Sequence, residues 1–197
     1  MCEIQWLSDG DLLALMVGPK TAQQLLKEVN GSLAALLLNE AAAAYDPKPK
    51  VQAKLKAARE LVRRSLREAL RRGDVLSSPA VVRDFLRVTL EGRDHEVFLV
   101  VFMDAQNRVI AAEEMFRGTL TQTSVYPREV VKRSLFHNAG AVIFAHNHPS
   151  GIAEPSRADE ALTQALKQAL ALVDVKVLDH FVVGTGCCMS FAERGLI

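Results

Sequence analysis

The spacing of apolar side chains divides the chain into two parts. Up to about residue 72 it follows the helical period, and short polar or Gly/Pro breaks separate expected helices over 8–17, 21–29, 32–44 and 51–72. Helices joined by such short connections typically form a small bundle. The first part is therefore predicted to be a small all-α domain.

From residue 79 on, helical stretches alternate with apolar runs of strand length. We expect helices over 79–90, 127–136 and 157–173, strands over 96–103, 108–116, 141–148 and 175–183, and a short strand or loop over 118–123. The run 96–103 is apolar on both faces, which predicts a central strand covered on two sides. The pattern indicates an α/β (α+β layered) domain with a mixed sheet flanked by helices. The predicted domains are 1–74 and 75–197.

Composition and charge limit the kinds of partner that the chain is expected to bind. The chain has 197 residues, is 49% hydrophobic and carries a formal net charge of +1. Residues 1–90 hold 14 Lys and Arg against 10 Asp and Glu, whereas residues 91–197 hold 10 against 13, so any contact with a polyanion is expected in the first part. No apolar run reaches membrane-spanning length and the N-terminus lacks signal-peptide features, which predicts a cytoplasmic protein without membrane contact.

The candidate chemistry lies between residues 146 and 159. His146 and His148 alternate along an expected strand and thus project to one face, while Asp159 falls in the first turn of the next helix. Two imidazoles and a carboxylate can hold one tetrahedral ion and leave a fourth position to water, as catalytic zinc sites do. Ser156 and Asp159 also have the spacing of a helix capping box, so capping and metal ligation are both open for Asp159.

The segment His-Asn-His-Pro-Ser-Gly, followed by Pro-Ser-x-x-Asp with seven residues between His148 and Ser156, resembles the JAMM (MPN-plus) zinc metalloproteases and specifically their bacterial RadC branch. The resemblance extends to 118–120, 125–129 and 178–184 and covers roughly 78–197. It implies a cytidine-deaminase-like JAMM fold and one Zn²⁺ per chain, held by His146, His148 and Asp159. At Asn147 this branch differs from its usual relatives, in which Ser or Thr is commoner, and the Asn147 side chain is expected to point away from the metal.

The resemblance also implies the reaction, which is hydrolysis of a peptide or isopeptide bond in a peptide or protein substrate. Ser156 is then expected to stabilise the oxyanion. A proton carrier is needed as well, and the candidate acids are Glu96, Glu113, Glu114 and Glu129. We assign Glu96, because it heads an apolar strand directly after a helix, as the catalytic glutamate of the resembled family does. A homodimer is compatible with the sequence.

Two further features leave alternatives open. Asp179 and His180 fit either a pair that orients a metal ligand or a pair that faces solvent. RadC-like proteins usually begin with a helix-hairpin-helix-like domain that contacts nucleic acid, but here residues 45–50 hold prolines instead of the hairpin glycines.

The alternative function is a DNA-repair-associated DNA-binding protein whose metal site is structural or inactive. Its contacts would come from the basic helix 51–72, through Arg59, Arg63, Arg64 and Arg67. The same arginines are also explained as the solvated face of an amphipathic helix. We favour that explanation, because two glutamates interrupt the charge and no aromatic residues are interleaved for base stacking.

Overall fold

The structure is a computed structural model that describes residues 4–38, 48–72, 79–118 and 124–197. The chain divides into two compact units, Met1–Val62 and Arg63–Ile197. Among the described helices, none combines the length and the apolar character needed to cross a membrane.

The first unit is helical, as predicted. A short 3₁₀ helix, η1 (Ile4–Trp6), precedes α1 (Asp9–Val17), α2 (Pro19–Glu28), α3 (Leu33–Leu38) and the first part of α4 (Pro49–Arg72). The Ser8 hydroxyl caps α1 by accepting from the amide of Asp11 at 3.2 Å. The buried core consists of Leu13, Ala22, Leu25 and Leu55. The predicted end of the third helix, 39–44, and residues 45–47 of the altered hairpin lie outside the described residues.

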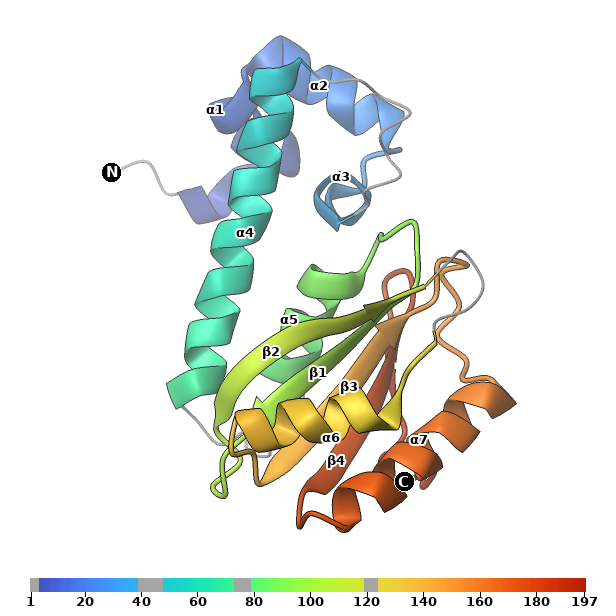
Figure 1. The fold of residues 1–197 in the computed structure, drawn as a ribbon. Helices are drawn as coiled ribbons and strands as arrows, with labels where there is room; N and C mark the ends of the chain where they lie inside the picture. The colour runs from blue at the N-terminus through green and yellow to red at the C-terminus, as the bar shows by residue number, and fades with distance from the viewer. Residues whose placement is uncertain (1–3, 39–47, 73–78, 119–123) are drawn as a thin grey trace. The chain divides into compact units, whose positions relative to one another are not determined.

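The second unit contains a five-stranded mixed sheet (Figure 1). Its strands are β1 (Val97–Met103), β2 (Val109–Arg117), β3 (Ala141–Asn147), β4 (Lys176–Val183) and β5 (Cys188–Ser190), in the spatial order β2-β1-β3-β4-β5. β3 and β4 are parallel and the other neighbouring pairs are antiparallel. The mixed sheet was predicted. Of the expected strand or loop 118–123, only Gly118 is described.

Helices cover both faces of this sheet (Figure 1): α5 (Pro79–Leu90) lies on one face, and α6 (Pro127–Phe136) and α7 (Arg157–Ala171) lie on the other. All seven residues of β1 are buried, as predicted for a central strand. Alternate β1 side chains enter two separate cores, because successive side chains of a strand point to opposite faces. Leu70, near the end of α4, belongs to the core on the α5 face.

Candidate metal centre

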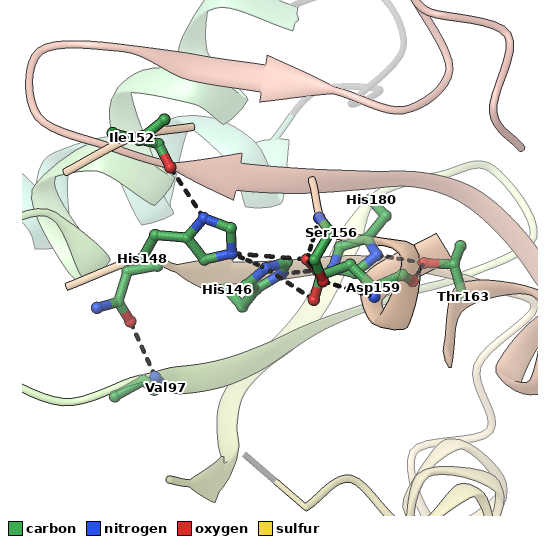
Figure 2. A network of polar contacts seen from close by, with 9 residues as sticks. Val97, His146, His148, Ile152, Ser156, Asp159, Thr163 and His180 are labelled. Carbon is green, nitrogen blue, oxygen red and sulfur yellow. Dashed lines mark hydrogen bonds and ion pairs between the residues drawn. The ribbon is translucent and has the colours of Figure 1, made fainter. Parts of the chain in front are cut away.

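The end of β3 brings two imidazoles together with a carboxylate from α7. The Nε2 atoms of His146 and His148 lie 3.0 Å apart, and the Asp159 carboxylate oxygens lie 3.4 Å from the first and 3.6 Å from the second. Figure 2 shows the three side chains pointing toward one another. One ligand atom from each lies within 4.8 Å of the others, so the group could hold a metal ion. Two imidazole nitrogens and a carboxylate form a donor set that suits zinc.

The centre is closed on its inner side and reachable on its outer side. The side chain of His146 is 1% exposed, whereas those of His148 and Asp159 are 19% and 14% exposed. An ion held by these three groups would thus be anchored in the protein at His146 and could meet solvent or a substrate beside the other two. A site open on one side is typical of catalytic rather than structural metal centres.

Asp159 both caps α7 and faces the histidines. Its Oδ2 accepts from the backbone amide of Ser156 at 2.7 Å and from the Ser156 hydroxyl at 2.6 Å, while the Ser156 Oγ accepts from the Asp159 amide at 3.2 Å. Its Oδ1 lies toward His146. Burial raises the pKa of Asp159, but its contacts with His146 and His148 outweigh it and hold the pKa well below its usual range. The carboxylate is therefore charged and available as a ligand.

The position of His148 is set by the loop that follows it. Its ring Nδ1 lies 2.8 Å from the carbonyl oxygen of Ile152, which can only accept, so Nδ1 carries the proton and Nε2 presents a lone pair. Its backbone amide donates to the carbonyl of Val183 at 3.0 Å. The neighbouring Asp159 carboxylate raises the pKa of His148 against the effect of burial, and the charge of Glu96 adds to the increase.

Two observations relate Glu96 to the cluster of His146, His148 and Asp159: its electrostatic contact with His148 and the register of β1 with β3. Phe98 of β1 pairs with His146 of the antiparallel β3, so the residue two positions before Phe98 lies at the same end of the sheet as His148. The backbone around Glu96 is well held. Its carbonyl accepts from the amide of Gly118 at 2.8 Å.

Asn147 holds the residues on either side of Glu96. Its Oδ1 accepts from the Val97 amide at 2.9 Å and its Nδ2 donates to the His95 carbonyl at 3.0 Å. As expected, this side chain points away from the cluster of His146, His148 and Asp159 and toward the backbone of β1. The asparagine at this position thus supplies a carboxamide long enough to reach β1.

The other candidate acids have partners elsewhere. Glu113 binds Arg133 and His137 of the α6 region, and Glu114 binds Arg93 and Arg117. Glu129 forms longer ion pairs with its neighbours on α6 at the surface. These carboxylates stabilise helix and strand contacts of the domain.

His180 is wholly buried, so of the two possibilities left open for it the solvent-facing one is wrong. Its Nε2 lies 2.8 Å from Nδ1 of His146, and its Nδ1 lies 2.6 Å from the hydroxyl of Thr163. Burial, and then the charge of His146, lower the pKa of His180 well below its usual value. Asp179 points elsewhere and accepts from Ser190 and Ala192.

Sequence reasoning missed Thr163. Its one available signal was its spacing, four residues after Asp159 and therefore one turn further along the same helix.

The four arginines named for DNA contact lie on α4. Arg59, Arg63 and Arg67 are half-buried and Arg64 is exposed. All four already take part in interactions within the chain.

The comparisons with known proteins agree with this geometry. A family model described as RadC-like JAB domain matches residues 76–196. A UPF0758 protein of Nitrosospira multiformis is 56% identical over 202 residues, which cover 98% of this chain and 90% of the relative. UPF0758 proteins of Nitrosomonas eutropha and Nitrosomonas europaea are 57% and 54% identical over 201 residues, covering 97% of this chain and 90% of each relative.

Proposed function

The chain belongs to the RadC-like JAB domain family, and from that premise we propose that it is a zinc-dependent hydrolase of amide bonds, acting on a peptide or an isopeptide. The observation that carries the proposal is the convergence of His146, His148 and Asp159 on one point at the partly open end of the sheet. Each ligand is oriented by a further hydrogen bond, which is the usual arrangement around a bound metal.

His146, His148 and Asp159 would hold one zinc ion per chain. Bound there, zinc would polarise the scissile carbonyl and bring the pKa of a water molecule close to neutrality. The outer side of the centre, beside His148 and Asp159, is where the substrate carbonyl would enter, since His146 is closed off by the protein. The amide bond would be broken by addition of water to the carbonyl carbon.

Glu96 is proposed as the group that moves protons. It would take a proton from the attacking water and give it to the leaving nitrogen, so that one carboxylate serves both steps. Support comes from its electrostatic contact with His148 and from the hydrogen bonds that hold its backbone. The ion pairs of Glu113, Glu114 and Glu129 also make them poor alternatives.

Ser156 is proposed to stabilise the negative charge that develops on the carbonyl oxygen. Its exposed hydroxyl now donates to Asp159 Oδ2, so it already points toward the ligand cluster. When Asp159 binds a metal, that proton can turn to a substrate oxyanion. Loss of one such donor typically lowers kcat about 100- to 1,000-fold. The test variant is Ser156→Ala, which also removes the cap of α7. Ser8→Ala removes the cap of α1 and is the matched control for the loss of helix capping alone.

The proposal is tested with protein purified without a metal-binding tag. We expect about one zinc per chain, turnover in a library of peptide and isopeptide substrates, loss of turnover in chelator and recovery with zinc. His148→Ala should lose both metal and turnover, because it removes a ligand. Glu96→Gln should keep the metal and lose turnover. Glu129→Gln is the matched control, since it removes an acid that is outside the proposed site, and it should keep both.

Two outcomes contradict the proposal. Stoichiometric zinc that persists after His146 and His148 are both replaced by alanine would show that the metal lies elsewhere. Turnover of a cleaved substrate at the wild-type rate in Glu96→Gln would remove Glu96 from the reaction.

A further inference from the structure

A chain of three hydrogen bonds runs behind His146, on the side away from the ligand cluster (Figure 2). Nδ1 of His146 lies 2.8 Å from Nε2 of His180, and Nδ1 of His180 lies 2.6 Å from the Thr163 hydroxyl. That hydroxyl lies 2.6 Å from the backbone carbonyl oxygen of Asp159. The chain thus begins at one expected ligand and ends at the backbone of another.

The chemistry of the last link sets the direction of all three bonds. A carbonyl oxygen only accepts, so the single hydroxyl proton of Thr163 must be donated to Asp159. The Thr163 oxygen then accepts from His180, which places the His180 proton on Nδ1. The opposite direction would require Thr163 to donate two protons, and it has one.

The burial of His180 completes the argument. The ring is fully buried and lies among the rings of Phe98, Phe144 and Phe191, an environment that disfavours a charged imidazole. With its one proton on Nδ1, its Nε2 is an acceptor. It therefore accepts from Nδ1 of His146, and Nε2 of His146 is left with a lone pair that faces His148 and Asp159.

We infer that Thr163 and His180 are positioning residues that hold His146 in the Nδ1-protonated tautomer and so prepare its Nε2 for a metal ion before the ion arrives. The inference rests on the proposed metal centre and adds the means by which its buried ligand is oriented. Because the chain closes on the Asp159 carbonyl, it also couples the ring of His146 to the first turn of α7, which carries the third ligand.

The test uses variants that remove or keep the hydroxyl of Thr163. Thr163→Val keeps the shape of the side chain and removes both of its hydrogen bonds, whereas Thr163→Ser keeps the hydroxyl. Thr89→Val is the matched control, because the buried Thr89 hydroxyl makes the same kind of bond, to the Phe85 carbonyl four residues earlier at 2.7 Å, on the opposite face of the sheet. It carries the same general cost of losing a buried hydroxyl.

Zinc affinity, measured in the full chain by competition with a chelator, is the first readout. We expect Thr163→Val to weaken zinc binding about 10- to 100-fold, the usual effect of losing a group that orients a metal ligand. Thr163→Ser and Thr89→Val should stay close to the wild type. Wild-type affinity in Thr163→Val would overturn the inference.

The second readout needs no variant. Long-range ¹H–¹⁵N NMR of the metal-free wild type should find His146 protonated on Nδ1 and His180 protonated on Nδ1. A His146 ring protonated on Nε2 would overturn the inference even if Thr163→Val fails to fold.

His146→Ala separates the two proposals. If it abolishes zinc binding while Thr163→Val does not weaken it, the metal centre stands and the positioning role is wrong. If zinc binding survives in His146→Ala, the metal centre itself is wrong.

Discussion

Replacing Asn147 with alanine should loosen the attachment of the Glu96 segment to the sheet. Asn147 is 2% exposed, and its carboxamide joins the Val97 amide to the His95 carbonyl. The alanine side chain reaches neither group. The substitution leaves the metal ligands in place and removes the two bonds on either side of Glu96.

The expected loss of stability follows from which of the two groups can reach water. Val97 is wholly buried, so its unpaired amide should cost about 1–3 kcal/mol. His95 is half-buried, and its carbonyl can regain a water molecule. Removal of the packed carboxamide adds about 1 kcal/mol. The free energy of unfolding should therefore fall by about 2–4 kcal/mol.

Urea unfolding followed by circular dichroism measures this loss, and hydrogen exchange of the Val97 amide measures its local origin. We expect that amide to exchange faster in Asn147→Ala than in the wild type. Turnover should fall by about 100-fold, because a displacement of a reacting group by about 1 Å can have that effect, while zinc content stays near one per chain. Gln24→Ala, which removes an exposed carboxamide, is the control and should change stability by less than about 0.5 kcal/mol.

The assigned role of Asn147 in holding the Glu96 segment would be refuted by two results together. The free energy of unfolding of Asn147→Ala would change by less than about 0.5 kcal/mol, and the protection of the Val97 amide would be unchanged. Loss of zinc in Asn147→Ala would refute a narrower point, namely that this side chain acts on the Glu96 segment and leaves the ligands undisturbed.

Three other predictions concern electrostatics, packing and nucleic acid. The hydrogen bond from Arg133 of α6 lowers the pKa of Glu113, so the stabilisation by this carboxylate is full above its unfolded pKa and is lost as pH falls through its folded pKa. Urea unfolding of Glu113→Gln should therefore show a free energy of unfolding lower by about 1 kcal/mol near neutral pH and a smaller difference in acid. In Gly184→Ala the new Cβ would overlap the backbone after His148, so zinc affinity and Tm should fall more than in Gly10→Ala, where the Cβ would make only ordinary van der Waals contacts; equal losses would contradict this. If the basic face of α4 binds duplex or branched DNA, Arg63→Ala and Arg64→Ala should weaken binding and reduce its salt dependence, and no binding at low salt would end that alternative.

Local pattern was enough to predict most elements and the three residues that could hold a metal ion. Helical and strand periods depend on neighbouring residues, so the mixed sheet, the buried central strand and the helices on it could be predicted from spacing. The same holds for His146 and His148, which a strand places on one face, and for Asp159 in the first turn of α7. The local pattern could not decide whether Asp159 caps α7 or faces the histidines. In the structure it does both, because Oδ2 accepts from the Ser156 amide while Oδ1 lies toward His146.

Only the tertiary structure decided what surrounds those three side chains. His180 meets His146 from 34 residues away, and Asn147 meets Val97 from 50 residues away, each across a pair of strands. Such contacts depend on strand register, and a shift of one residue would turn each of these side chains to the opposite face. A sequence shows which residues can lie on one face, but the pairing of strands determines which of them meet. Here it brings Thr163 and His180 behind His146 and Asn147 beside Glu96.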